Sequence, residues 1–423
     1  MRLRSKLVIT LLLQLIGAIS TLFVSIIVTR RYGAEAQGYL SYYRSAVDLF
    51  ANTAIFGFPQ AFIYMINTKI LNVDFVVKFI NRYCSLFGLV FVIIAIVAYT
   101  TGIAESTGFN LLAVLSLAVA SFGMMLHGMY RSVCLSTKSN YIFNLVSIMP
   151  AFFIFLIYFI WHAVNYEKLV LASVFASIIS FLFPMFIFKK SIFGKWTFDK
   201  ELVGKVAKYG FWSFIPSVAA SLCIVGTYAI LRRGGISDAT CGNFSISVLF
   251  ITASVTPLNM IAPILFNDWA GEKWKKGTVN SYSLLSHLGL VIALAGVMFS
   301  VVLVRSITAM VFGEKLLGST ESTRVLLFGL FAFYQNRLLS SLLLAVGNPS
   351  ATAVGWIIKT ATVFSALYLG LSSSLTGAAL AWVIGEFASM IYMCVVASQE
   401  TGWPITRIAG VSPSRAFEML RSS

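Results

Sequence analysis

Charged side chains are scarce in this sequence. Only 11% of its 423 residues are Asp, Glu, Lys or Arg, whereas 59% are hydrophobic and the mean hydropathy is +0.89. Soluble domains carry roughly 25% charged residues, because polar groups must cover their surfaces. The shortage excludes a soluble enzyme, a soluble nucleic-acid-binding domain and a disordered chain. The sequence predicts a polytopic membrane protein.

Motifs for catalysis and metal binding are also missing. No HExxH or GxSxG pattern occurs, and residues 313–320 resemble a phosphate loop but lack the lysine after the second glycine. The five cysteines are scattered without CxxC spacing, and the three histidines lie in different segments. We therefore expect no catalytic residue, no metal, no cofactor and no disulfide framework.

Acidic residues are outnumbered by basic ones, 15 to 31, which gives a net charge of +16. In a membrane protein, such an excess marks cytoplasmic loops and fixes orientation. We therefore expect membrane lipids, and no nucleic acid, beside these charges.

The hydrophobic residues form segments of about 20, the length that a helix needs to cross a bilayer. Twelve are predicted: 7–29, 40–66, 83–103, 109–128, 141–163, 168–188, 209–231, 243–266, 284–304, 323–345, 351–371 and 376–397. Helices are expected because a helix satisfies its own backbone hydrogen bonds. The fold class is therefore all-α, with about 12 transmembrane helices.

Lysine and arginine predict the orientation. With the N-terminus inside, the cytoplasmic segments hold 20 of these residues and the outer loops hold 8. This bias predicts that both termini are cytoplasmic.

The longest cytoplasmic connection falls at the midpoint of the chain. The predicted parts are a bundle at 1–188, a linker at 189–208, a second bundle at 209–397 and a tail at 398–423. Within the linker, residues 199–208 place apolar and lysine side chains on opposite faces. This pattern fits an amphipathic helix on an anionic leaflet or, equally, a solvated loop.

The two halves resemble each other weakly. Arginine pairs, Arg30–Arg31 and Arg232–Arg233, follow the first and seventh segments at matched positions. Six spans in each half would give parallel repeats, an arrangement typical of transporters that rock two bundles around a central cavity.

Several short segments resemble the polysaccharide flippases of the multidrug/oligosaccharidyl-lipid/polysaccharide exporter superfamily. They are residues 29–38, 56–61, 208–211, 345–349 and 375–379. Each is degenerate, but their order and spacing cover nearly the whole chain. The first predicted span, between Leu7 and Val28, carries neither the arginine expected of peptidoglycan-precursor flippases nor the acidic residue of many drug-exporting relatives, which favours the polysaccharide branch.

The resemblance implies a bacterial inner-membrane protein that passes an undecaprenyl-pyrophosphate-linked oligosaccharide to the periplasmic leaflet by alternating access. It also implies a cationic cavity, a proton or sodium ion as coupling ion, and polysaccharide polymerase or assembly proteins as partners. A drug or cation antiporter of the same superfamily is the first alternative. A membrane enzyme, such as an O-antigen polymerase or a lipid-linked glycosyltransferase, is the second, but it would need a sizeable extramembrane loop.

Five charged residues fall well inside predicted spans, away from the span ends. Such charges are costly in a bilayer and usually face a cavity or a partner. Arg44, Arg337 and Lys359 are candidates for binding a pyrophosphate or an acidic sugar, because arginine in particular matches phosphate geometry. Asp48 and Glu386 are candidates for ion coupling or for pairing with these cations. The alternative is structural ion pairing, of Arg44 with Asp48 and of Lys359 or Arg337 with Glu386.

Two further groups of polar residues are candidates. Arg30, Arg31, Arg232 and Arg233 would steer or gate an anionic head group on the periplasmic side, or would reach toward the membrane surface. Four uncharged polar residues would line a sugar-binding cavity or join helices by hydrogen bonds; they are Gln14, Asn52, Asn259 and Asn336.

Overall fold

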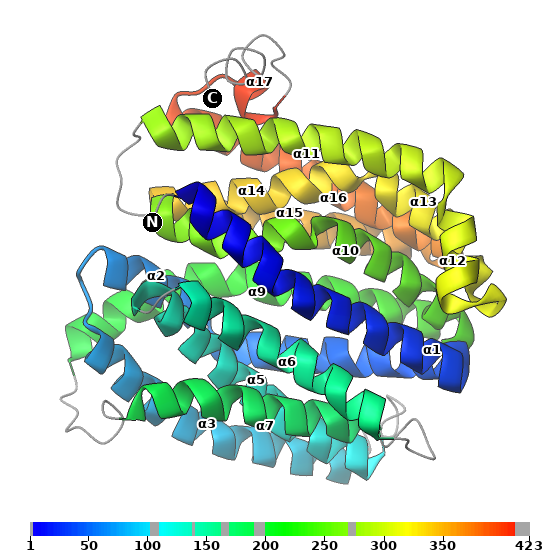
Figure 1. Ribbon diagram of the computed structural model, residues 1–423, viewed down its shortest axis with the longest axis horizontal. Helices are drawn as coiled ribbons and strands as arrows, with labels where there is room; N and C mark the ends of the chain where they lie inside the picture. Colours follow the sequence, from blue (N-terminus) through cyan, green and yellow to red (C-terminus); the bar gives the residue numbers. More distant parts are fainter. Residues whose placement is uncertain are drawn as a thin grey trace. The chain divides into compact units, whose positions relative to one another are not determined.

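The computed structural model describes residues 3–101, 110–137, 140–161, 169–189, 199–269 and 276–410. Across these ranges the chain is helical, without strands, which confirms the predicted all-α class (Figure 1). The contacts divide the chain into two compact units, Met1–Val225 and Gly226–Ser423. Each unit is described by itself.

The first unit is built from long helices. They are α1 (Leu3–Ile55), α2 (Phe58–Asn67), α3 (Val73–Thr100), α5 (Leu111–Thr137), α6 (Asn140–Ile160), α7 (Val170–Ile187) and the first part of α9 (Lys200–Arg233). Among them, α1 packs extensively on α6 and α5, and α5 packs on α7. These four helices enclose the interior of the unit.

Helix α1 consists of two arms joined at Gly33. Its 53 residues would extend about 80 Å at the helical rise, far beyond a hydrocarbon core of about 30 Å. Gly33 has φ 87° and ψ −174°, a conformation that is open to glycine and not to other residues. Figure 1 draws the arms as two separate blue runs. The sequence predicted an outer loop at residues 30–39, between its first two spans; the structure replaces it with this single-residue break.

The second predicted span, 40–66, is also broken. Phe56 (φ 50°) and Gly57 (φ 66°) separate α1 from α2, and Pro59 lies in the first turn of α2, where its missing N–H is harmless. Gly57 lies directly on the backbone of α9, because a Cβ atom there would come within 2.2 Å of the carbonyl oxygen of Gly210. The break therefore lets the chain pass close to α9.

The second unit continues α9 with further helices. They are α10 (Asp238–Trp269), α11 (Lys276–Val302), α12 (Val304–Phe312), η2 (Glu314–Ser319), α13 (Thr320–Phe328), α14 (Leu330–Val346), α15 (Pro349–Tyr368), η3 (Leu371–Ser373), α16 (Leu375–Thr401) and α17 (Ile405–Ile408). Helices α13 and α14, which the sequence predicted as one span at 323–345, are bent by 52° at Gly329.

Local sequence signals start two of these helices. The Asn348 side chain accepts a hydrogen bond from the Ala351 N–H at 3.1 Å, and Pro349 occupies the first turn of α15. The Ser374 hydroxyl likewise accepts from the Gly377 N–H at 3.0 Å at the start of α16. These caps fix where α15 and α16 begin, and therefore which residues they place opposite each other.

Ten helices are long and apolar enough to cross a membrane, or eleven if the bent α13–α14 pair counts as one span, within the described ranges. The chain is a multi-pass membrane protein. The sequence predicted twelve spans, and the difference arises at α1, whose two arms count as a single helix of 48 apolar-rich residues.

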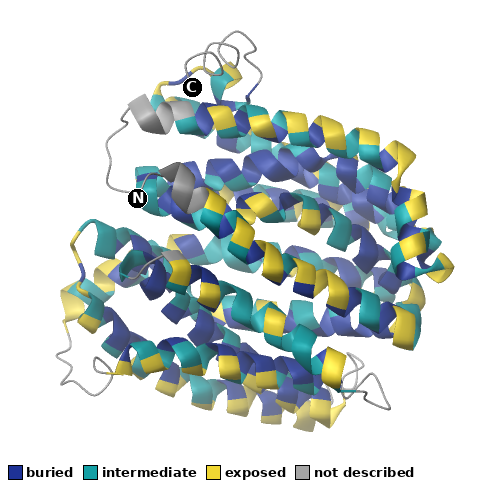
Figure 2. Cartoon of the chain, viewed as in Figure 1, coloured by how far each residue is buried: buried dark blue, intermediate teal, exposed yellow. Residues whose placement is uncertain are grey.

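Exposed apolar side chains line the outer faces of these helices, as membrane contact requires. On α11 they recur every three or four residues, at Leu284, Leu288, Val291, Leu294 and Met298. Figure 2 shows such yellow positions alternating with buried ones along the helices.

The predicted linker differs from the structure in its second part. Residues 200–208 are the first turns of α9 and continue into it without interruption, instead of forming a separate surface helix. Residues 190–198 of the linker and 411–423 of the tail lie outside the described residues. The contacts place the boundary between the units after Val225, inside α9.

Candidate functional site

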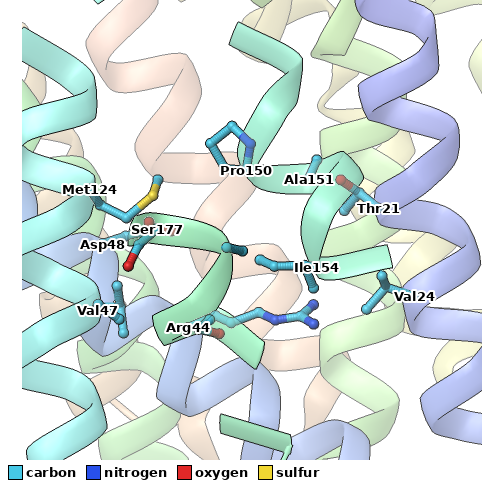
Figure 3. Close-up of a pocket in the computed structure, with 13 residues that line it drawn as sticks. Thr21, Val24, Arg44, Val47, Asp48, Met124, Pro150, Ala151, Ile154 and Ser177 are labelled. Carbon is cyan, nitrogen blue, oxygen red and sulfur yellow. The ribbon is translucent and has the colours of Figure 1, made fainter. Parts of the chain in front are cut away.

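The first unit contains a partly open cavity of about 200 Å³ between α1, α5, α6 and α7 (Figure 3). Its lining is mainly apolar, with a few polar groups from α1 and α7. The lining residues are Thr21, Val24, Arg44, Val47, Asp48, Ala120, Met124, Pro150, Ala151, Ile154, Ser173, Ala176 and Ser177. The cavity thus contains two of the five predicted intramembrane charges.

Arg44 brings a positive charge into this cavity. Its side chain is half-buried, and its guanidinium carbon lies 5.6 Å from the centre of the Tyr158 ring. Figure 3 shows the guanidinium extending toward Ile154 and Val24. The Nε and Nη2 atoms are buried without a hydrogen-bond partner. A buried guanidinium with unused donors is costly unless an acceptor reaches it.

Asp48 lies one helical turn further along α1, and its side chain is accessible. In Figure 3 it lies beside Met124 and Ser177, on the other side of the cavity from the Arg44 guanidinium. Although both residues line the cavity, the Arg44 Nε and Nη2 atoms donate no hydrogen bond to Asp48. The cavity therefore presents a cation and a carboxylate, and the cation keeps two donor atoms without a hydrogen bond.

Ser173 adds a third polar group. It is 8% exposed, lines the cavity from α7, and its hydroxyl is buried without a hydrogen-bond partner. Together with Arg44 Nε and Nη2, it gives the cavity three unused donor atoms. Such a set suits a small anionic group.

The second unit holds the other intramembrane charges in a buried cluster. Lys359 of α15 forms an ion pair with the Glu386 carboxylate of α16, and these residues are only 5% and 2% exposed. The Asn336 amide of α14 donates to the Glu386 carboxylate and, at 2.9 Å, to the Glu386 backbone carbonyl. Three helices therefore meet at one carboxylate.

Aromatic rings surround the ammonium of Lys359. Its Nζ lies 4.5 Å from the ring centre of Trp356, 5.6 Å from that of Phe333 and 5.9 Å from that of Trp382. Arg337 also uses Trp356, with its guanidinium carbon 4.7 Å from the ring centre. Cations at these distances are attracted to the negative face of the ring.

Glycines bring α15 and α16 close enough for this contact. A Cβ atom at Gly385 would lie 2.9 Å from the Lys359 carbonyl oxygen, and one at Gly355 would lie 2.7 Å from the Met393 side chain. A larger residue at Gly385 would push the two helices apart, and one at Gly355 would displace the Met393 side chain. The small residues thus place Lys359 opposite Glu386.

The four outer arginines lie at helix ends. Arg30 and Arg31 are exposed near the end of the first arm of α1. Arg232 lies in the last turn of α9 and forms an ion pair with Asp238 at 2.8 Å, whereas Arg233, the last residue of the helix, is exposed. Their role as a periplasmic gate stays a prediction.

The uncharged polar candidates differ in their surroundings. Gln14 donates to Asn144 at 2.8 Å, and Asn52 donates to Ser221 at 2.9 Å. Asn259 is exposed on α10. Asn336 lies in the cluster around Glu386. Gln14, Asn52 and Asn336 therefore join helices, and a role of any of the four in sugar binding stays a prediction.

Sequence reasoning missed two polar residues of the first unit. Arg131 falls between the predicted spans 109–128 and 141–163, but α5 continues to Thr137, and the Arg131 Nε donates to Ser147 at 2.7 Å. Ser173 gave no signal, because a lone serine in an apolar run has many structural uses.

No group of three or more residues that could hold a metal ion occurs in the described part of the chain.

No family model matches the chain, and no curated protein matches it. Solved structures do. A multidrug resistance MATE family transporter of the MOP superfamily is similar in its outward-facing conformation, with a TM-score of 0.72, 13% identity and coverage of 95% of this chain and 98% of that one. An inward-facing conformation of such a transporter is similar with a TM-score of 0.67 and 12% identity, and the match covers 91% of this chain and 96% of that one. A MOP superfamily transporter from Pyrococcus furiosus, described as having a binding pocket of reverse polarity, gives 0.70, with 15% identity and coverage of 97% of both chains. At these identities the similarity shows the fold, which is that of MATE and MOP transporters.

Proposed function

We propose that this protein is a transporter, not an enzyme, and that it moves a lipid-linked oligosaccharide across the bacterial inner membrane by alternating access. The substrate class is an undecaprenyl-pyrophosphate-linked repeat unit, carried from the cytoplasmic to the periplasmic leaflet, and both termini are cytoplasmic. The fold supports the transport step, because similar structures are described in outward-facing and inward-facing conformations.

The environment of Arg44 is the observation that supports an anionic substrate. Its unused Nε and Nη2 donors line the cavity of the first unit together with the unpartnered Ser173 hydroxyl. A guanidinium binds two phosphate oxygens at once, and such charge-assisted hydrogen bonds are strong. At about 200 Å³ the cavity is smaller than a typical ligand pocket, which spans about 300–1,000 Å³. It therefore suits a phosphate and not the glycan itself.

The other two cations rank below Arg44. Glu386 already neutralises Lys359, so this lysine has little charge to offer a substrate. Arg337 is half-buried and stacks on Trp356, where it contributes positive field beside that pair. The outer arginines would meet the head group on the periplasmic side. A proton or a sodium ion would be the coupling ion, with Asp48 as its first candidate site, because Glu386 is held by Lys359.

A cation or drug antiporter is the second candidate. It is favoured by the accessible Asp48 carboxylate in the same cavity, and by the multidrug resistance transporters among the similar structures. The similar transporter whose pocket has reverse polarity indicates that this fold accommodates pockets of different charge. The unpartnered donors of Arg44 favour the anionic substrate here.

Deletion of the gene tests the proposal in cells. In a strain without a redundant transporter, we expect the lipid-linked repeat unit to accumulate in the cytoplasmic leaflet and surface polysaccharide to be lost. Normal periplasmic delivery of the repeat unit would refute the proposal. Increased sensitivity of the deletion strain to toxic organic cations, with a normal amount of surface polysaccharide, would support the antiporter function instead.

A further inference from the structure

We infer that the second unit contains a binding site for a primary alkylammonium ion, and that the side chain of Lys359 occupies this site as a tethered ligand. The site consists of the Glu386 carboxylate and the rings of Trp356, Phe333 and Trp382. The inference does not depend on the substrate proposed above, because it concerns an internal site of the second unit alone.

The surroundings of the ammonium are those of a cation receptor. One carboxylate supplies the opposite charge, and three rings lie 4.5 to 5.9 Å from Nζ. Aromatic rings around an ammonium group, together with a carboxylate, are how proteins recognise organic cations. An ordinary structural ion pair needs only the carboxylate.

Parts of the site are positioned by contacts that do not involve the lysine. Asn336 binds both the side chain and the backbone carbonyl of Glu386, and Trp382 Nε1 donates to Thr227 at 2.9 Å. Gly385 and Gly355 set the separation of α15 and α16. Removal of the lysine side chain would therefore leave the carboxylate and the rings in place around an empty volume.

A second acceptor is available at the site. Asn336 is 1% exposed, and its Oδ1 atom is buried without a hydrogen-bond partner, since both of its recorded contacts use Nδ2. An ammonium ion has three donors, whereas the lysine contacts only Glu386 Oε1 among the described hydrogen bonds. A free amine that reorients in the site would find this unused acceptor.

The tethered ammonium has a consequence for specificity. An external amine cannot enter while Lys359 fills the cage, because a ligand on the same chain competes at a high effective concentration. Lys359 is therefore a specificity residue that keeps organic cations out of the second unit. Loss of its side chain should open the site to them.

The test uses the full-length protein, purified in detergent, with n-propylammonium chloride as the probe. This ion has the atoms that Lys359→Ala removes beyond Cβ. The measurement is the thermal unfolding midpoint, Tm, followed by tryptophan fluorescence, with equimolar sodium chloride as the salt control. Wild type, Lys359→Ala and the double variant Lys359→Ala/Glu386→Gln are compared.

We expect propylammonium to raise the Tm of Lys359→Ala saturably, by about 2–4 °C, because a ligand that binds only the folded state stabilises it. Wild type and the double variant should not respond beyond the salt control. An equal response of all three proteins, or none in Lys359→Ala, would overturn the inference.

A second variant covers the case in which Lys359→Ala shows no cooperative unfolding. Lys359→Met keeps most of the buried volume and leaves room only for the ammonium group, so the probe becomes ammonium chloride against N-methylglucamine chloride. A Tm rise with ammonium that Glu386→Gln abolishes supports the site. Equal Tm values in both salts would overturn it.

Discussion

At the scale of single residues, similar charges have different environments in the two units. Arg44 lies on a cavity with two unused donors, whereas Lys359 lies against a carboxylate inside an aromatic cage. A buried pair contributes little net stability, because desolvation offsets the attraction of its charges. An unsatisfied buried donor, in contrast, carries a cost that a ligand can remove. Arg44 is therefore the residue where binding energy is available.

Replacement of Arg44 by alanine should lower transport of a lipid-linked oligosaccharide by about 10- to 100-fold, because a hydrogen bond to a charged group contributes roughly 1.5–3 kcal/mol. Arg44→Lys should retain part of the rate, since it keeps the charge but loses the fork. The rate is measured in proteoliposomes. Thr21→Ala, on the same cavity, is the matched control and should transport normally. Equal rates for Arg44→Ala and Thr21→Ala would assign Arg44 a structural role.

The Lys359–Glu386 pair makes a separate prediction for stability. Lys359→Ala or Glu386→Gln alone should lower the free energy of unfolding by about 3–5 kcal/mol, because each leaves an uncompensated buried charge. The double variant Lys359→Met/Glu386→Gln should recover most of this loss, since neither charge remains. Denaturant unfolding in detergent gives the three values. A double variant as unstable as the sum of the single ones would show that the pair is not coupled.

At the scale of elements, the breaks within helices are the main departures from the sequence prediction. Hydrophobicity located most spans, because lipid contact requires apolar faces such as that of α11. It did not locate the break at Gly57 or the bend at Gly329, because both interrupt apolar segments without changing their composition. Such breaks depend on which part of the backbone packs against the glycine. At Gly57 it is the backbone at Gly210.

Gly57→Ala should impair folding of the first unit. Its φ is 66°, and the new Cβ would clash with the Gly210 carbonyl at 2.2 Å, so two backbones would have to separate. We expect a lower yield of monodisperse protein and a lower Tm. Gly204→Ala in α9 is the control, because nothing lies within 4 Å of its Cβ position and alanine favours a helix. Similar Tm values for the two variants would contradict the close approach.

The candidate site was predictable in part. Because a charged side chain inside a membrane is energetically costly, the sequence indicated that Arg44, Asp48, Lys359 and Glu386 need a cavity or a partner. The structure places each of them in a cavity or in an ion pair. Sequence spacing could not choose between these outcomes. Arg44 and Asp48 are one turn apart yet point to different sides, whereas Lys359 and Glu386 lie on different helices, 27 residues apart. Tertiary packing decides such pairings, and the sequence does not record it directly.

At the scale of the whole molecule, the bias of lysine and arginine predicts cytoplasmic termini. This orientation places the turn before α10 outside and the turn before α3 inside. The five native cysteines are buried, so single introduced cysteines report on their own positions. We expect Ser237→Cys to react in intact cells with a membrane-impermeant maleimide, and Ile70→Cys, also at an exposed site, to react only after lysis. The reverse labelling pattern would show that the termini lie outside and that the proposed direction of transport is wrong.

Transport of an anionic lipid-linked glycan is the central claim, and reconstitution tests it most directly. Purified protein in liposomes would be given an undecaprenyl-pyrophosphate-linked oligosaccharide in one leaflet, or an organic cation in the lumen, and the appearance of each on the other side would be followed. We expect the glycan lipid to cross at a rate that Arg44→Ala reduces. The cation should leave the lumen no faster than it leaves protein-free liposomes. Efflux of the cation, with the glycan lipid no faster than in protein-free liposomes, would contradict the account.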